Sequence, residues 1–401
     1  MQPVYIVDSI RTPRARANNG GGLNQLNPYE LLDVLYKHID HKNILDLHSI
    51  NEVILGCVTQ YGEQAGNIAK SSALFSGYPD SISGLTINRF CSSSLDAINL
   101  GYLKIQSQQA ENIIAGGVEM MSRVPMLSDK AAIWNDLTIA TKARIFLMGS
   151  GADLIATLFN ISRAEADMQA LKSQQRAMIA QKNRHFKSIV AVIDEQKAIN
   201  CYQDECIRSD TTFESLSSLE PSFQKLGEKG VDKAQLNYFP ELNEISHIHT
   251  AGNSPAMADA ASLTLLSSHS IQENGIRARA KIISVAIVND DPLLVLSGCL
   301  LATKKILEQN NLQVKDIDLF EIHEAFASTI VYCQQQLKID DEKLNVNGGC
   351  IALGHPMGAT GSIMMSTLID ELERQDLTTG VVATSGAAGA GTAILIERIE
   401  V

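Results

Sequence analysis

Three residues have side chains and surroundings suited to covalent chemistry at a carbonyl group: Cys91, His323 and His355. The strand-like sequence LTINR leads into Cys91, and apolar residues at helical spacing follow it, so we expect the thiol at a strand-to-helix junction. The positive end of a helix and its free backbone N–H groups favour the thiolate, which is the form that attacks carbonyls. A small buried structural cysteine is the alternative interpretation of this segment.

The two histidines lie far downstream, in EIHEAFA and NGGCIALGHPMGATG. Glycines around His355 allow the backbone to come close to a ligand. A neutral imidazole accepts a thiol proton and can then, as a donor, help to hold a thioester oxygen. Taken alone, each histidine is also compatible with a structural role.

The elements that must position these residues follow an α/β pattern. Short apolar runs alternate with amphipathic stretches at both ends of the chain, which predicts a sheet covered by helices. Four pairs of similar segments further suggest an internal duplication. The pairs are VYIVDSI with AKIISVAIV, INEVILGCV with IDLFEIHEAF, ISGLTINRFCSSS with LNVNGGCIALGHPMGATG, and ENIIAGGVEMM with TGVVATSGAAGAGTAILIE.

The middle of the chain has a different character. It contains one long amphipathic helix, predicted over 162–186, and a stretch at 224–249 without clear periodicity, predicted as an irregular surface excursion. We therefore expect four parts: 1–121 as the first part of an N-terminal half, 122–250 as an inserted loop domain, 251–275 as the completion of that half, and 276–401 as the C-terminal half.

Composition excludes several classes of protein. The 401 residues are 45% hydrophobic and 19% charged, and the net charge of -12 has the wrong sign for general binding to nucleic acid or anionic membranes. No apolar run approaches the roughly 18 residues of a membrane span, and no secretory signal is apparent. Seven cysteines without close clustering indicate a reducing compartment, so we expect a cytoplasmic enzyme.

Over nearly its whole length the chain resembles the thiolase family. The resemblance depends on ordered matches: RTP at 11–13, GNIAK at 66–70, NRFCSSSL around Cys91, AGGVEMMS at 115–122, IRSDTTFESL from 207, LEPSF at 219, TAGNS at 250, HEAFA at 323, NVNGGCIALGHPMGATG at 345 and the closing TSGAAGAG. It implies two similar α/β halves in a duplicated five-layer α-β-α-β-α architecture with an inserted loop domain. Such chains assemble as homodimers or homotetramers.

The resemblance also implies roles for individual residues. Cys91 is similar to the nucleophile that takes the acyl group, and His355 to its activating base and one donor of an oxyanion hole. His323 stands where many thiolases have Asn, and the HEAF form is similar to the fatty-acid-oxidation multienzyme branch, where it positions a water or donates to the thioester oxygen. The backbone N–H groups of Cys91 and Ala387 would form a second oxyanion hole.

One departure from the family pattern affects the proton transfers expected of the reaction. Ser385 stands where the family has a second cysteine that shuttles a proton between substrate carbon, or the CoA thiol, and solvent. An unactivated hydroxyl is a poor base near neutral pH, so serine is expected to slow that step by about 10² to 10⁴ if the role is wholly lost. A water or Cys350, which is close to His355 in the sequence, is the alternative source of the proton.

The resemblance implies that CoA is a substrate, with no cofactor and no metal. The partners are acyl-CoA and CoA, with no nucleic acid, no membrane span and a possible partner subunit of a fatty-acid-oxidation complex. The residues implied in CoA binding are Met148, Arg208, Ser215, Phe223, Ala251 and Phe326. The run Arg176, Lys182, Arg184, His185 and Lys187 is either a solvated helix face or a phosphate-facing patch.

Three hypotheses for function follow. The first is a thiolase that cleaves 3-ketoacyl-CoA with CoA, or condenses acetyl-CoA, through an acyl-Cys91 intermediate. The second is an acyl-CoA transferase or hydrolase that lacks Claisen chemistry because of Ser385. The third is a non-catalytic CoA-binding subunit.

Overall fold

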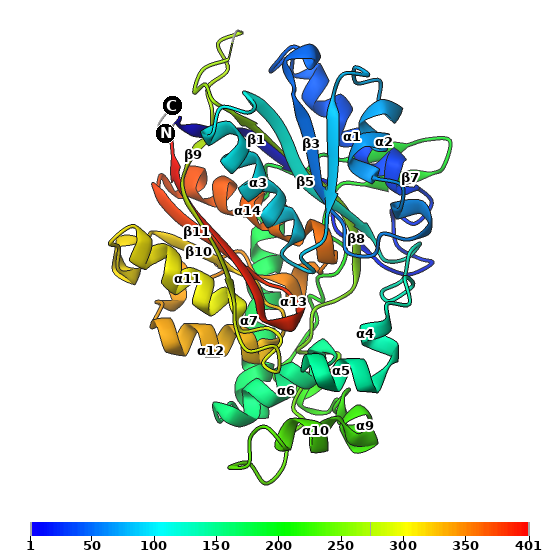
Figure 1. The fold of residues 1–401 in the computed structure, drawn as a ribbon, viewed down its shortest axis with the longest axis vertical. Coiled ribbons are helices and arrows are strands. Elements are labelled where there is room, and N and C mark those ends of the chain that lie inside the picture. Colours follow the sequence, from blue (N-terminus) through cyan, green and yellow to red (C-terminus); the bar gives the residue numbers. More distant parts are fainter. Residues whose placement is uncertain (1, 273, 400–401) are drawn as a thin grey trace.

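The computed structural model describes residues 2–272 and 274–399, which form two sheet-and-helix halves and a segment inserted within the N-terminal half (Figure 1). The N-terminal half contains strands β1 (Val4–Arg11), β2 (Ala15–Arg16), β3 (Glu52–Gly56), β4 (Ser83–Ile87), β5 (Asn112–Met120) and β8 (Ala258–Ser267). The C-terminal half contains β9 (Ala280–Asn289), β10 (Leu319–Ile322), β11 (Thr379–Ser385) and β12 (Ala390–Arg398).

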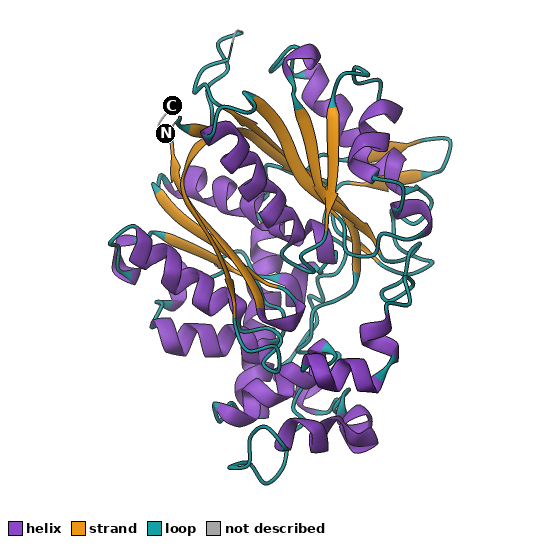
Figure 2. Cartoon of the chain, in the orientation of Figure 1, coloured by secondary structure: helices purple, strands orange, loops and turns teal. Residues whose placement is uncertain are grey.

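The strands of the two halves join into one hydrogen-bonded sheet in the order β10-β11-β12-β9-β1-β8-β5-β3-β4, with β2 paired to β8. A short antiparallel pairing, from Val4 opposite Ile282 to Ile6 opposite Ala280, connects the halves. On either side of this connection the strands diverge into two separate layers (Figure 2). The parallel pairs are β3 with β4, β3 with β5, and β10 with β11.

The strand order confirms the duplication. Strand β1 corresponds to β9, β3 to β10 and β5 to β11, as three of the four segment pairs predict, and β8 corresponds to β12. The fourth pair matches only in part. LTINR contributes to strand β4, whereas residues 345–349 form no strand and Leu344 makes a single bridge to Phe320.

The helices complete five layers, as the resemblance implies. Helices α3 (Ser93–Gln106) and α14 (Thr360–Gln375) pack on each other between the two sheet layers. Helices α1 (Pro28–His41) and α2 (Ile68–Phe75) cover the outer face of the N-terminal layer, and α11 (Gly298–Gln309) and α12 (Ala327–Leu337) lie against the C-terminal layer. Strands β5 and β8 are buried along their whole length because helices cover both of their faces.

Most helices of the segment between β5 and β8 form the lower end of the molecule in Figure 1, whereas its short strand pair is drawn in the upper part. Its elements are α4 (Ala132–Asn135), α5 (Leu137–Ala143), α6 (Met148–Leu158), α7 (Arg163–Lys182), β6 (Val192–Asp194), β7 (Ile199–Cys201), α8 (Phe213–Ser217), α9 (Gln224–Leu226) and α10 (Asp232–Leu236). The long predicted helix is present as α7 but ends at Lys182. The excursion predicted at 224–249 is more regular than expected, because short helical turns occupy its first half.

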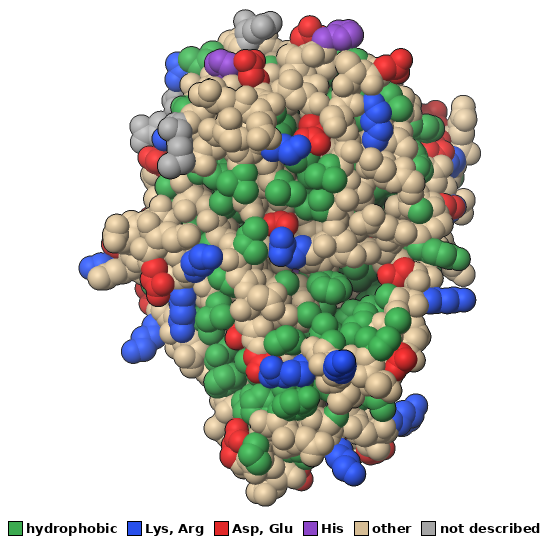
Figure 3. Space-filling model, viewed as in Figure 1, with side chains coloured by type: hydrophobic (Ala, Val, Ile, Leu, Met, Phe, Trp, Pro, Cys, Tyr) green, Lys and Arg blue, Asp and Glu red, His purple; other side chains and the backbone are tan. Residues whose placement is uncertain are grey.

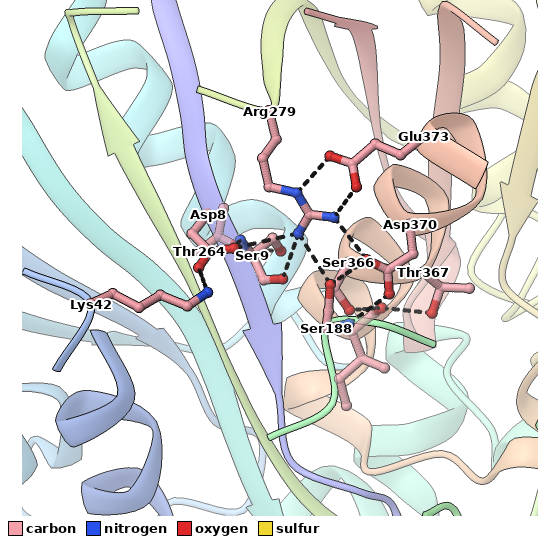
Figure 4. Close-up of polar contacts among 11 residues, drawn as sticks. Asp8, Ser9, Lys42, Ser188, Thr264, Arg279, Ser366, Thr367, Asp370 and Glu373 are labelled. Carbon is pink, nitrogen blue, oxygen red and sulfur yellow. Dashed lines mark hydrogen bonds and ion pairs between the residues drawn. The ribbon is translucent and has the colours of Figure 1, made fainter. Parts of the chain in front are cut away.

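A network of charges around Arg279 links β1, the inserted segment and α14 (Figure 4). The Arg279 guanidinium donates to Asp370 at 2.8 Å and to Glu373 at 2.7 and 2.8 Å, and it lies 3.4 Å from Asp8. Ser188, from the inserted segment, donates to Asp370 through its backbone N–H and its hydroxyl at 2.8 and 2.6 Å. The Arg279 guanidinium is the cation paired with the buried Asp370 carboxylate, so removing it leaves that carboxylate without a counterion.

Charged groups on the molecular surface are mixed in sign. On the face drawn in Figure 3, Lys and Arg side chains are scattered among Asp and Glu and do not gather into one patch. Within residues 2–272 and 274–399, no helix combines the length and the apolar character that a membrane crossing requires.

Candidate active site

Cys91 lies between the end of β4 and the start of α3, so the predicted strand-to-helix junction is confirmed. The preceding Phe90 has a φ of +50°, in the left-handed region that costs a non-glycine residue about 1 to 3 kcal/mol. Ser93 holds this turn, because its hydroxyl accepts from the Arg89 N–H at 2.9 Å and donates to the Phe90 carbonyl at 2.5 Å. The turn projects the thiol from the start of the central helix.

His355 lies beside this thiol. Its Nε2 is 3.2 Å from Cys91 Sγ, and its Nδ1 is 2.7 Å from the Thr360 hydroxyl. The His355 N–H donates to the Ala256 carbonyl at 2.7 Å, and the preceding Gly354 has a φ of +98°, which only glycine adopts readily. Because Nε2 must accept the thiol proton, Nδ1 carries the ring proton and donates it to Thr360.

The resting pair is neutral. Burial, with a contribution from Glu119, raises the pKa of Cys91 to about 12. Burial, His323 and Arg14 hold the pKa of His355 well below its ordinary value. The expectation that the helix start would favour a resting thiolate is therefore wrong, because desolvation of the buried sulfur outweighs the field of the helix. The thiolate arises when His355 accepts the proton during attack.

His323 lies against His355, with ring centroids 4.5 Å apart. Its Nδ1 is 3.1 Å from the backbone carbonyl of Ser385. A carbonyl oxygen only accepts hydrogen bonds, so Nδ1 carries the proton and Nε2 carries a lone pair. This Nε2 is buried and has no hydrogen-bond partner among the described residues.

The Ser385 hydroxyl forms its hydrogen bonds with backbone groups and not with the histidines. Its hydroxyl donates to the Leu296 carbonyl at 2.7 Å and accepts from the Cys299 N–H at 2.9 Å. The single hydroxyl proton is thus committed to a backbone acceptor, and the side chain is fully buried. Ala387, two residues on, packs in an apolar cluster with Ala325 and Phe326.

An apolar pocket of about 170 Å³ opens over Cys91, His323 and His355. The predicted CoA-binding residues Met148, Phe223 and Phe326 lie in its wall, and the last two stack edge to face at 5.7 Å. The remaining lining was not predicted: Met121, Met126, Ser254, Pro255, Ala256, Met257, Leu296, Ala325 and Met357. Five methionines in one wall supply a flexible apolar surface suited to an acyl chain or a pantetheine arm.

The other predicted CoA residues lie outside this wall. The Arg208 guanidinium donates to the carbonyls of Ala251 and Gly252 at 3.3 and 3.0 Å, so two predicted residues are brought together. Ser215 caps α8 reciprocally with Thr212. These contacts give Arg208, Ala251 and Ser215 structural roles within the chain, and their roles in CoA binding stay predictions.

Cys350 lies close to both histidines. Its sulfur and one ring nitrogen of each of His323 and His355 lie within 4.8 Å of one another, the one group of three potential metal ligands found in the described part of the chain. Two of the four ring nitrogens already bond to Cys91 and Ser385. Cys350 lines a separate small cavity with Arg14 and Glu321, and burial raises its pKa to about 12.

Two further groups of residues have other partners. His247 and His249 each bond to Asp153, at 2.9 and 2.6 Å, and form a buried polar network within the inserted segment. A surface cleft of about 1040 Å³ is lined by Lys182, Arg184 and Lys187 among others and contains none of Cys91, His323 and His355.

Comparison with known proteins identifies the class to which this site belongs. Residues 4–232 match the Thiolase, N-terminal domain, and residues 276–398 match the Thiolase, C-terminal domain. The 3-ketoacyl-CoA thiolase of Aliivibrio fischeri is 37% identical, with 99% of this chain and all of that protein covered. The beta-ketoadipyl-CoA thiolase of Pseudomonas knackmussii is 35% identical over 99% of both chains.

A solved structure agrees with these relatives. The crystal structure of the Bacillus anthracis acetyl-CoA acetyltransferase superposes with a TM-score of 0.83 at 30% identity, covering 100% of this chain and 99% of that one. The chain belongs to the thiolase family and is an acyl-CoA acyltransferase of thiolase type.

Proposed function

We propose that this thiolase cleaves 3-ketoacyl-CoA with CoA, and runs the reverse condensation of acetyl-CoA, through an acyl group on Cys91. The observation that carries the proposal is the 3.2 Å contact between Cys91 Sγ and His355 Nε2 at the floor of an apolar pocket. Cys91 attacks the 3-keto carbon while His355 takes the thiol proton, and cleavage of the C2–C3 bond releases acetyl-CoA. The CoA thiol then removes the acyl group.

The pocket supports CoA as a substrate. Met148, Phe223 and Phe326 would hold the pantetheine arm, and Arg208 would meet the diphosphate or adenine. The backbone N–H groups of Cys91 and Ala387 would hold the thioester oxygen. Relatives named 3-ketoacyl-CoA thiolase and beta-ketoadipyl-CoA thiolase support this class of substrate. The mechanism uses no resident cofactor or metal.

The test measures acetoacetyl-CoA thiolysis together with acylation of Cys91 by mass spectrometry. We expect one acyl group on the Cys91 peptide and release of acetyl-CoA. Cys91→Ser should lose both, and Cys201→Ser, a buried cysteine in β7, is the matched control. Acylation followed only by release of free acid would favour the hydrolase hypothesis, and absence of acylation would favour the non-catalytic subunit.

We also propose that the chain forms a homodimer through β4. This strand ends the sheet, so its outer backbone groups have no neighbouring strand, and Leu85 on it is 36% exposed. Leu74 and Phe75 on the adjoining α2 are also exposed, which extends the apolar surface beside the edge. Sedimentation should give a dimer for the native chain and a monomer for Leu85→Lys. A homotetramer and a partner subunit stay predictions.

We further propose a cytoplasmic location. The mechanism requires Cys91 as a thiol, and all seven cysteines are free, including Cys299 and Cys333, whose sulfurs are 3.3 Å apart. A reducing compartment keeps such neighbours as thiols. Fractionation of cells that express a tagged chain tests the location.

A further inference from the structure

We propose that His323 Nε2 is the group that takes the proton from the substrate α-carbon and from the CoA thiol, the role for which the family resemblance assigns a second cysteine at position 385. The inference rests on the proposed thiolase function. It concerns the second half-reaction, after Cys91 is acylated.

The tautomer of His323 leaves one of its ring nitrogens unprotonated. The Ser385 carbonyl accepts from Nδ1 at 3.1 Å and thereby leaves Nε2 without a proton. This nitrogen is the one buried ring nitrogen without a hydrogen-bond partner in the described residues, and His323 lines the substrate pocket. A buried lone pair on a residue that lines a substrate pocket, with no partner among the described residues, is available as a proton acceptor.

The other candidates are less suitable. The Ser385 hydroxyl donates its only proton to Leu296 and does not line the pocket. Cys350 lines a different cavity, beside Arg14 and Glu321, and is not among the residues that line the substrate pocket. His355 Nε2 is already engaged with the Cys91 sulfur. Of the groups that line the pocket, His323 Nε2 alone combines basic character with an open hydrogen-bonding position.

In the condensation direction, the proton removed from carbon ends on the Cys91 sulfur. His323 Nε2 takes a proton from the methyl carbon of acetyl-CoA, and the resulting enolate carbon attacks the acyl carbon held on Cys91. The new C–C bond forms as the C–S bond to Cys91 breaks. The proton taken from carbon passes to the Cys91 thiolate through His355, whose ring is 4.5 Å away. The reverse sequence cleaves 3-ketoacyl-CoA.

The same nitrogen serves the transfer to CoA. Nε2 accepts the CoA thiol proton, the CoA thiolate attacks the acyl group, and Cys91 leaves as a thiolate that takes up that proton. Burial lowers the pKa of His323 to about 4, so Nε2 is unprotonated at neutral pH. A developing enolate or thiolate beside the ring stabilises the imidazolium and raises its pKa during the step.

The first experiment compares the native enzyme with His323→Asn, which introduces the amide found in many thiolases. Deuterium exchange into the methyl group of acetyl-CoA in D₂O reports the carbon proton transfer, and mass spectrometry reports Cys91 acylation in a single turnover. We expect the exchange to fall by about 10² or more while acylation changes much less. His269→Asn, at an exposed site, is the matched control.

The possible results separate failure of this proposal from failure of the proposed function. Exchange in His323→Asn within about three-fold of the native rate overturns the proposal, as does an equal loss of exchange and acylation. A native enzyme that is never acylated at Cys91 refutes the proposed function instead. If His323→Asn does not fold, ¹⁵N spectra of native enzyme labelled on histidine decide the matter: we expect the neutral Nδ1–H form, and an Nε2–H form at neutral pH overturns the proposal.

Discussion

His323 and Ser385 meet through a ring nitrogen and a backbone carbonyl, 3.1 Å apart, and not through the serine hydroxyl. The residue at position 385 therefore acts on the site through an atom that every amino acid possesses. The carbonyl selects the tautomer of His323, whereas the side chain serves the backbone of α11 and the segment before it. The hydrogen bond that orients the His323 ring therefore does not involve the side chain at position 385.

Ser385→Ala should destabilise the fold. The substitution leaves the buried Leu296 carbonyl and Cys299 N–H without their partner, and each unmade hydrogen bond costs about 1 to 3 kcal/mol. Urea unfolding measures the change in free energy. Ser217→Ala, which removes an exposed hydroxyl, is the comparison, and equal small effects at both sites would contradict the assigned hydrogen bonds.

Thr360→Val should slow acylation of Cys91. The hydroxyl accepts from His355 Nδ1 at 2.7 Å and fixes the tautomer that leaves Nε2 free to take the thiol proton. Loss of one such hydrogen bond corresponds to about ten-fold in rate. Thr360→Ser keeps the hydroxyl and should retain most of the rate in the same single-turnover assay. Equal rates for both variants would show that Thr360 does not orient the ring.

His247 should make stability fall at alkaline pH. Its hydrogen bond to Asp153, reinforced by Asp232, raises its pKa to about 9 from the ordinary value near 6.5. A folded pKa above the unfolded one contributes stability that is complete below about pH 6.5 and is lost as pH rises through about 9. Thermal unfolding of the native chain should show this decline, and His247→Gln should flatten it. A parallel decline in the variant would exclude His247 as its source.

Arg279→Met should lower the free energy of unfolding by about 3 to 5 kcal/mol, because it removes the cation paired with the buried carboxylate of Asp370, whereas Asp8 keeps its ion pair with Lys42 (Figure 4). Lys37→Met is the matched control, since Lys37 forms an exposed pair with Asp33 that is expected to contribute about 0.5 kcal/mol or less. Similar changes in the two variants would show that the network around Arg279 contributes little to the free energy of unfolding.

The sequence predicts the parts of this molecule that local pattern and chain order determine. Periodicity and spacing along the chain predict the junction at Cys91, the long helix α7 and three of the four duplicated pairs. The fourth pair fails in its strand because 345–349 contains two glycines, and the backbone N–H groups of Asn345 and Gly349 donate to the Phe320 carbonyl and the Ser173 hydroxyl.

The site chemistry is less predictable. The resting state of Cys91 depends on how completely the fold buries the sulfur, and no local pattern reports this burial. The direction of the Ser385 hydroxyl depends on backbone groups at Leu296 and Cys299, about ninety residues earlier in the chain. The methionines of the pocket wall come from four separate segments, since Met121 and Met126 share one loop, so only the assembled fold shows the wall. Thr360 could have been suspected from its position in GHPMGATG.

The place of β8 in the sheet has a consequence for biosynthesis. This strand pairs with both β1 and β5, yet it is made only after the entire inserted segment. While the chain emerges from the ribosome, β1 and β5 have no strand between them, and their apolar edges stay unpaired until Ala258–Ser267 is exposed. A chaperone that shields nascent strands would therefore act during synthesis of residues 121–257, and a ribosome stalled within that interval would leave the most aggregation-prone form of the chain.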